Sequence, residues 1–216
     1  MPGTTPQRTC SPTRRRLRRA GRKIAALLIV AAIGGGLILS DRLGLFGRAP
    51  QDDHAAYGGR QTRVVRVHDG DTFEVAVPDG TTDHTDVRFW GVDTPELAHR
   101  PGEQDQHYAR EAAEFVQRLC EGKRVRLDLE PGRSPRGKHG RLLAWVYLPD
   151  GRLLNGVLVA AGYGYADPRF PHSRQDEFAR LQKQAMRDGR GLWQAVTPDD
   201  LPYYYRGKLT LPERER

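Results

Sequence analysis

The order of two hydrophobic periodicities is the feature that most constrains how this chain folds. Between residues 62 and 193, five segments alternate apolar and polar residues, the pattern typical of β-strands with one buried face. The expected strands lie near residues 65–67, 73–77, 87–89, 125–129 and 142–148. Pro-Asp-Gly turns follow the second and the fifth of them, at 78–80 and 149–151.

Three further segments place their apolar residues at helical spacing. They are residues 108–119, 154–161 and 178–186, each followed closely by a glycine. Ser173 and Asp176 have the spacing of a capping box at the start of the third helix. Three strands, a helix, two strands and two helices, in that order, fit a five-stranded OB-fold barrel with three packed α-helices. The predicted fold class is therefore all-β or α+β.

A charge-free apolar run precedes this region. Residues 24–39 contain no charged side chain and directly follow a basic segment, residues 1–23. We expect a transmembrane anchor over residues 24–46, with 1–23 as a cytoplasmic tail, because Lys and Arg stay on the cytoplasmic side and the body is then exported. A cleaved secretory signal has the same plan and would instead release the protein. Residues 47–61 are polar and rich in Gly and Ala, and are expected to be a linker.

The net charge of +8 is a property of the amino terminus and not of the predicted barrel. Residues 1–23 hold eight basic and no acidic side chains, so the rest of the chain is balanced at 27 basic and 27 acidic. Overall basicity therefore does not indicate a nucleic-acid partner, and any such case depends on a local site. The two cysteines, Cys10 and Cys120, exclude a disulfide framework, and Cys120 is expected to be a small buried hydrophobe.

Two acidic runs flank the hairpin predicted from the second and third strands. Antiparallel pairing of residues 72–77 with 85–92 puts Asp71 opposite residue 91 and Asp93 opposite residue 69. Four carboxylates then meet at one end of the hairpin: Asp69, Asp71, Asp93 and Glu96. Carboxylates so close repel each other, and a hard divalent cation such as Ca²⁺ or Mg²⁺ removes the conflict.

Basic residues are expected in the same neighbourhood. Arg88 lies in the third strand, and a glycine-punctuated basic loop, residues 133–141, opens the fifth. The planar fork of arginine matches phosphate oxygens in a bidentate manner. Carboxylates that hold a cation, together with arginines facing the same space, suggest chemistry on a phosphodiester.

Four blocks of sequence resemble one known family. V-H-D-G-D-T-F-E-V (67–75), V-R-F-W-G-V-D-T-P-E (87–96), G-R-L-L-A-W-V-Y (140–147) and G-R-G-L-W (189–193) are similar to the staphylococcal-nuclease-like (thermonuclease) family, in its order and at its spacing. The resemblance covers residues 62–193 and leaves 194–216 as a C-terminal extension. It implies an OB-fold barrel and Ca²⁺-dependent hydrolysis of DNA and RNA to 3′-phosphorylated products.

The resemblance also implies roles for individual residues. Calcium would be held by Asp71, Asp93 and the backbone carbonyl of Thr94, with Asp69 close behind. Glu96 would position or deprotonate the attacking water, and Arg88 and Arg141 would grip the phosphate. Asn155 matches a structural asparagine that holds a loop to the barrel.

The basic loop departs from the family pattern. Gly137 and His139 occupy places where the family often carries an acid and a tyrosine. Lys138, His139, Tyr163 and Tyr165 are candidates for substrate contact. The alternative for Arg133, Arg136 and Lys138 is a mobile exposed loop that attracts polyanions, and the alternative for His139 is no role. The two tyrosines could instead pack against the barrel. Trp90, Trp145 and Trp193 are expected in the core.

The rival function is a nucleic-acid-binding or scaffold module with a spent active site. A weaker rival is an OB module that binds sugar or peptide, which does not need the acidic residues. The presence of the metal carboxylates, the glutamate and both arginines together favours the enzyme. No obligate protein partner is expected.

Overall fold

The computed structural model describes residues 52–98 and 100–212. The predicted tail (1–23) and transmembrane anchor (24–46) lie outside the described residues. Within the described part of the chain, every helix is too short or too polar to cross a bilayer.

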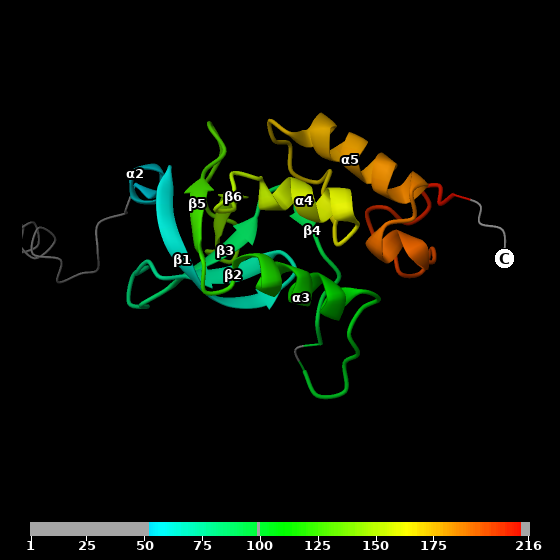
Figure 1. Cartoon of the computed structure of the whole chain (residues 1–216), viewed down its shortest axis with the longest axis horizontal. Helices are drawn as coiled ribbons and strands as arrows, with labels where there is room; N and C mark the ends of the chain where they lie inside the picture. Colours follow the sequence, from blue (N-terminus) through cyan, green and yellow to red (C-terminus); the bar gives the residue numbers. More distant parts are fainter. Residues whose placement is uncertain (1–51, 99, 213–216) are drawn as a thin grey trace, which may run out of the picture. The chain divides into compact units, whose positions relative to one another are not determined.

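Five strands close into a barrel in the order β1-β2-β3-β6-β5 (Figure 1). Their bounds are β1 Arg60–Asp69, β2 Thr72–Val75, β3 Thr85–Phe89, β5 Arg124–Asp128 and β6 Leu142–Tyr147. Strands β3 and β6 pair in parallel, whereas the other neighbours are antiparallel. The predicted five-stranded OB-type barrel is confirmed.

The barrel interior is filled by the apolar residues of the alternating pattern. Phe73 of β2 and Phe89 of β3 meet edge to face, with ring centroids 4.9 Å apart, and both are buried. Val87 is also buried, while Arg88 between it and Phe89 is only partly buried. Successive side chains of a strand point to opposite faces, so Arg88 points away from the interior. The strand period thus places a guanidinium on the outside of the barrel wall.

All three predicted helices are present: α3 (Ala109–Cys120), α4 (Leu154–Ala161) and α5 (Gln175–Arg187). Helix α3 packs against β1, and α4 packs against both β6 and α5 (Figure 1). Cys120 is buried at the end of α3, as predicted for a small hydrophobe.

Asn155 fastens α4 to the barrel. Its side chain is fully buried, accepts from the Val146 N–H at 2.9 Å and donates to the carbonyls of Trp90 and Ala144 at 3.0 and 3.1 Å. A buried amide satisfied in this way stabilises one arrangement of the backbone, because an unpaired partner there is costly. The structural role implied for Asn155 is what the geometry shows.

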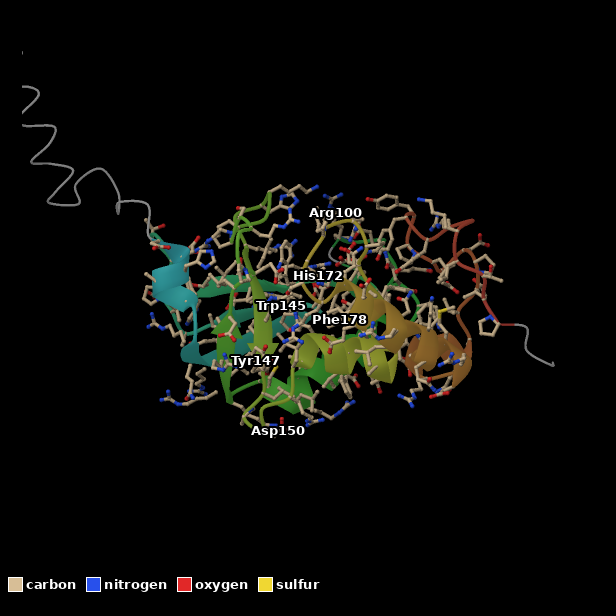
Figure 2. The ribbon with its side chains drawn as sticks, turned by 90° about the horizontal axis from the view of Figure 1, so that it is seen from above. Arg100, Trp145, Tyr147, Asp150, His172 and Phe178 are labelled. Atoms are coloured by element: carbon tan, nitrogen blue, oxygen red, sulfur yellow. The ribbon has the colours of Figure 1, made fainter. Side chains whose placement is uncertain are left out.

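The start of α5 differs from the predicted capping box. Ser173 donates both its N–H and its hydroxyl to the buried Glu130, at 2.6 and 2.9 Å, and the helix begins without a side-chain cap. Glu130 also accepts from Trp145 Nε1 at 2.8 Å. The Trp145 ring in turn contacts His172 and Phe178 (Figure 2). A long-range carboxylate therefore outcompetes the local cap, and the capping-box prediction is wrong.

Part of the predicted linker is structured. A short helix, α2 (Asp53–Tyr57), precedes β1, which already begins at Arg60. The buried Tyr57 hydroxyl lies 2.9 Å from the Thr85 hydroxyl on β3. The region around 53–61 is thus packed on the barrel and does not act as a free linker.

Arg136 holds this helix in place. Its guanidinium bonds Asp53 of α2 at 2.8 Å and Asp79 of the β2–β3 turn at 2.5 Å. It also donates to the carbonyl of Gly140 at 2.9 Å. The expectation of a mobile exposed loop is therefore wrong for Arg136, which joins three segments distant in sequence.

The C-terminal extension folds back onto the rest of the molecule. A short 3-10 helix (Gly191–Gln194) is followed by residues 195–212, of which Leu201 and Tyr204 are buried. Leu201 packs with Trp193 and Tyr165 in a second apolar cluster beside the barrel. Tyr165 belongs to a two-residue strand, β7 (Tyr165–Ala166), that pairs with β4 (Val92–Asp93). All three tryptophans are buried, as predicted.

Candidate active site

A two-residue turn brings the first acidic run to the site. Asp69 pairs with Thr72, which leaves Gly70 and Asp71 at the tip of the β1–β2 hairpin. The Asp71 N–H donates to Asp69 Oδ1 at 3.0 Å. A Cβ on Gly70 would lie 2.8 Å from Thr94 Oγ1, so only glycine lets this turn approach the second acidic run so closely.

The hairpin register fixes which residues face each other. Thr72 pairs with Arg88, and the Phe89 N–H donates to the Asp71 carbonyl at 2.8 Å. Asp71 thus lies opposite residue 89 and not 91, a shift of two residues from the predicted pairing. The predicted convergence still holds, because the Thr94 N–H donates to Asp71 Oδ2 at 2.9 Å.

Arg88 bridges the two acidic runs. Its Nη1 lies 2.5 Å from Asp71 Oδ1, and its Nη2 lies 2.5 Å from Asp93 Oδ1. Glu96 Oε1 is 3.8 Å from Nη1 of the same guanidinium. The Asp71 side chain is fully buried, whereas that of Glu96 is 46% exposed. One cation therefore holds together three of the four carboxylates that the sequence predicted to meet.

Burial and crowding set the charge states. Burial of Asp71 raises its pKa well above the usual value, and the nearby charges of Asp69 and Asp93 raise it further, against the lowering effect of Arg88. Burial alone would lower the pKa of Arg88, but Asp71 and Asp93 outweigh it and raise that pKa. The carboxylates of Asp69, Asp71 and Asp93 thus carry more negative charge than the Arg88 guanidinium can neutralise. This excess of negative charge favours binding of a second cation.

Arg141 reaches the site through a hydroxyl. Its Nη1 donates to Thr72 Oγ1 at 3.2 Å, and that hydroxyl donates to Asp71 Oδ1 at 3.0 Å. Both arginines expected at the phosphate therefore lie next to the carboxylates. Sequence reasoning gave Thr72 no role, although it directly follows Asp71 in a matched block.

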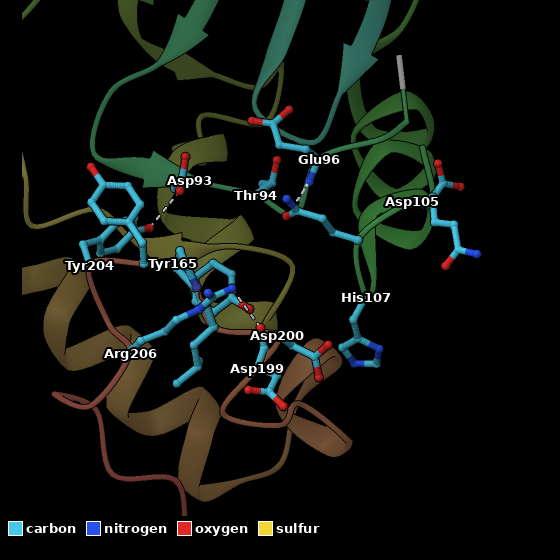
Figure 3. Close-up of a pocket in the computed structure, with 15 residues that line it drawn as sticks. Asp93, Thr94, Glu96, Asp105, His107, Tyr165, Asp199, Asp200, Tyr204 and Arg206 are labelled. Carbon is cyan, nitrogen blue, oxygen red and sulfur yellow. Dashed lines mark hydrogen bonds between the residues drawn. The ribbon is translucent and has the colours of Figure 1, made fainter. Parts of the chain in front are cut away.

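Two more residues on Asp93 were missed. Arg169 Nη2 lies 3.1 Å from Asp93 Oδ1, and the Tyr204 hydroxyl donates to Asp93 Oδ2 at 2.8 Å (Figure 3). Burial first, and then the charge of Asp93, raise the pKa of Tyr204, so the hydroxyl keeps its proton. Tyr204 belongs to the C-terminal extension, where no sequence pattern linked it to residue 93.

The tentative substrate residues have different surroundings. Lys138 and His139 are exposed in the loop before β6, and within the described residues no hydrogen bond or ion pair ties them to the carboxylates. Tyr163 stacks on Phe115 with centroids 4.1 Å apart, and Tyr165 is 3% exposed against Trp193. The structure therefore favours a packing role for both tyrosines over stacking on a nucleic-acid base.

The donor set at this site fits a hard cation. The Asp71 and Asp93 carboxylates contact the two terminal nitrogens of one guanidinium, and the Thr94 carbonyl is the third expected ligand; all are oxygen donors, which suit Ca²⁺ or Mg²⁺. A second group with metal-ligand spacing, His68, Glu74 and Asp86, has its ligand atoms within 4.8 Å of one another. It contains an imidazole and includes none of the predicted calcium ligands.

The candidate residues border a cavity of about 550 Å³. Asp93, Thr94 and Glu96 form one wall, and residues of the C-terminal extension form the opposite wall (Figure 3). A carboxylate at the edge of a cavity, beside two arginines and a cation site, can accept a proton from water while the arginines bind a phosphate. The arrangement is equipped for hydrolysis of a phosphate ester.

Comparisons with known proteins agree with this geometry. Residues 86–195 match the family described as Staphylococcal nuclease homologue. The chain is 33% identical over 132 residues to a thermonuclease of Staphylococcus hyicus, which covers 61% of this chain and 74% of that protein. It is 34% identical over 137 residues to a thermonuclease of Staphylococcus intermedius, covering 63% and 77%. An uncharacterized endonuclease of Escherichia coli is 32% identical over 136 residues, covering 63% and 78%. The chain belongs to the family of staphylococcal nuclease homologues.

Proposed function

We propose that this protein is a Ca²⁺-dependent nuclease that hydrolyses DNA and RNA to 3′-phosphorylated products. The observation that carries the proposal is the Arg88 bridge, with Asp71 and Asp93 each 2.5 Å from one guanidinium and Glu96 3.8 Å away. Membership of the nuclease family and the presence of every implied residue support it.

Asp71, Asp93 and the Thr94 carbonyl would hold the ion. Bound calcium would lower the pKa of water and polarise the phosphate. The neighbours of the two carboxylates keep them in place: the Thr94 N–H and the Thr72 hydroxyl on Asp71, and the Tyr204 hydroxyl on Asp93. Fixed ligands cost little reorganisation on binding.

Glu96 is the proposed general base. In this mechanism its carboxylate takes a proton from the attacking water, whose oxygen forms a bond to phosphorus while the bond to the 5′ oxygen breaks. The 5′ oxygen takes a proton from solvent water and leaves as a hydroxyl. The phosphate then remains on the 3′ oxygen. Arg88 and Arg141 contribute charge that stabilises the five-coordinate transition state more than the ground state.

The first test compares cleavage of single-stranded DNA with calcium, with a chelator, and with calcium after Glu96→Gln. We expect the chelator to abolish cleavage and Glu96→Gln to lower kcat about 10²–10⁴-fold, the usual contribution of a general base. Glu114→Gln is the matched control, because Glu114 is an exposed carboxylate on α3. Equal degradation in all samples contradicts the mechanism; binding of DNA without cleavage indicates the inactive binding module.

We also propose that the nuclease domain works outside the cytoplasm, tethered by residues 24–46 or released after cleavage of that segment. The support is the charge-free run at 24–39 after eight basic residues. Protease added to intact cells should degrade the domain if it is tethered, and a soluble form in the medium indicates release. Protection of the domain in intact cells, with none in the medium, contradicts export.

A further inference from the structure

Exposed aromatic side chains gather beside the candidate site. Among residues 52–98 and 100–212, three large hydrophobic side chains are exposed: Val65 at 36%, Phe170 at 54% and Tyr203 at 71%. The last two meet at Arg169, whose guanidinium carbon lies 5.7 Å from the centroid of each ring. The faces of these two rings are therefore available for contact with a ligand.

The aromatic group is directly connected to the proposed catalytic residues. Arg169 Nη2 is 3.1 Å from Asp93 Oδ1, so a single side chain separates the rings from a proposed calcium ligand. Tyr203 lines the same cavity as Asp93 and Glu96. A ligand in that cavity can therefore contact Tyr203 and the reacting groups together.

The guanidinium that joins the rings is held rigidly. Arg169 makes two bonds to the buried Asp167, both at 2.8 Å. Its guanidinium carbon also lies 4.3 Å above the centroid of the buried Tyr204 ring. Asp167 and Tyr204 hold the Arg169 guanidinium in one position, and the exposed rings of Phe170 and Tyr203 lie beside it. A ligand that binds there therefore costs little conformational entropy for ordering Arg169.

The charges around the cavity indicate which part of a ligand Tyr203 meets. Asp199 and Asp200 line the cavity with Tyr203 and outnumber Arg206, whose guanidinium bonds backbone carbonyls, so the two carboxylates disfavour a phosphate there. Arg88 contacts Asp93 and Glu96, which line the same cavity, and Arg141 reaches Asp71 through Thr72; both guanidinium groups attract phosphate. A neutral aromatic group of the ligand is therefore expected at the rings, with its phosphate toward the two arginines.

We propose that Phe170 and Tyr203, supported by Arg169, form a stacking platform for the unpaired bases of a single-stranded nucleic acid substrate. The proposal rests on the proposed nuclease function and adds a subsite to it. Aromatic rings bind bases through their faces without selecting a sequence, and a guanidinium between rings adds a cation–π contribution. Paired bases hide their faces, so the platform favours single strands over duplexes.

The test measures binding of a fluorescent single-stranded DNA by anisotropy with a chelator, and KM with calcium. Stacking contributes about 1–3 kcal/mol per base, so Tyr203→Leu and Phe170→Leu should each weaken Kd by at least about 5-fold and raise KM similarly. Tyr203→Phe keeps the ring and should bind within about 2-fold of wild type. Val65→Ala, an exposed apolar change on β1, is the control for altered surface.

An abasic oligonucleotide of equal length separates stacking from charge. Because it keeps every phosphate and lacks the bases, wild type and both leucine variants should bind it equally. Equal affinity of wild type and variants for normal DNA overturns the platform, as does absence of any wild-type binding in both assays. If Tyr203→Leu and Phe170→Leu cleave DNA as wild type does, only the stacking platform is refuted. If the two variants bind DNA more weakly but wild type does not cleave it, only the nuclease function is refuted. Melting temperatures verify that the variants are folded.

Discussion

Arg88 decides much of the chemistry at the scale of single residues. Its side chain is 13% exposed and meets Asp71 and Asp93 with separate nitrogens. Lysine has all its donors on one nitrogen, whereas the planar guanidinium gives each carboxylate a nitrogen of its own, so geometry as well as charge favours arginine here. Even so, the guanidinium leaves Asp71 in an environment that disfavours its ionised form.

Asp71→Asn should make the stability of the calcium-free protein less dependent on pH. The folded pKa of Asp71 is raised above its ordinary value of 3.8, so its contribution to stability is full below that value and is lost as pH rises through the folded pKa. Asparagine does not ionise and lacks that loss, although its NH2 group faces a donor in either orientation, because Arg88, Thr72 and Thr94 all donate to Asp71. Denaturant unfolding with a chelator, from pH 4 to 8, should show a smaller fall in the free energy of unfolding for the variant than for wild type.

Calcium should separate wild type from the variant. It should raise the melting temperature of wild type and leave the variant almost unchanged, because the variant lacks one ligand charge. Equal pH dependence of wild type and variant in chelator would contradict the electrostatic account.

At the same scale, the sequence identified the site residues whose positions follow from the spacing of the strands. Arg88 belongs to the β2–β3 hairpin, and Asp69, Asp71, Asp93 and Glu96 lie next to its two open ends, so strand periodicity and a turn are enough to bring them together. Arg169 and Tyr204 reach Asp93 through tertiary packing alone. No periodicity encodes a contact of this kind, and both residues were missed for that reason.

At the scale of elements, the sequence predicted the regular strands and helices. It did not predict the short helix α2 or the way in which α5 begins. All five barrel strands and three helices follow the hydrophobic period. Helix α2 has five residues, too few to establish a period, and it is held by an arginine 79 or more positions later in sequence. Ser173 has a local capping pattern, but the buried Glu130 provides a stronger, charged acceptor.

Arg136→Ala should loosen α2 from the barrel. The substitution removes charge-assisted bonds to Asp53 and Asp79 and leaves both carboxylates without their cation. We expect the free energy of unfolding to fall by about 1–3 kcal/mol, and the amides of residues 53–57 to exchange faster with solvent. Calorimetry and hydrogen exchange measure the two effects.

Arg133→Ala is the matched control for this loop. Arg133 is exposed, and the substitution should change stability by less than about 0.5 kcal/mol. Equal effects of the two substitutions would mean that the Arg136 bonds contribute nothing specific.

At the scale of the whole molecule, the last described segment completes a site that the first hairpin begins. Tyr204 donates to Asp93 across 111 positions of sequence, and Leu201 anchors the segment in the second apolar cluster. The family match covers residues 86–195, so Asp93 lies inside the matched region and Tyr204 lies outside it. The sequence predicted the barrel but left residues 194–216 undecided, since they contain no periodic pattern.

Tyr204→Phe should weaken calcium binding. The ring and its packing are kept, but Asp93 loses the donor that orients its second oxygen. Removal of such a supporting bond usually costs about 10–100-fold in metal affinity, and calorimetric titration with calcium should show at least the lower figure. Tyr205→Phe is the control, because the Tyr205 hydroxyl bonds the Ala166 carbonyl and not a ligand. Equal calcium affinities in both variants would exclude the positioning role.

The parallel pairing of β3 with β6 has a consequence for synthesis on the ribosome. Val87 pairs with Leu142, so the chain must be translated past residue 142 before the barrel closes, and Arg141 arrives with the closing strand. A nascent polypeptide that stops earlier holds the acidic hairpin but lacks the second guanidinium. The candidate site of this family member is therefore complete only after translation has passed the last strand of the barrel.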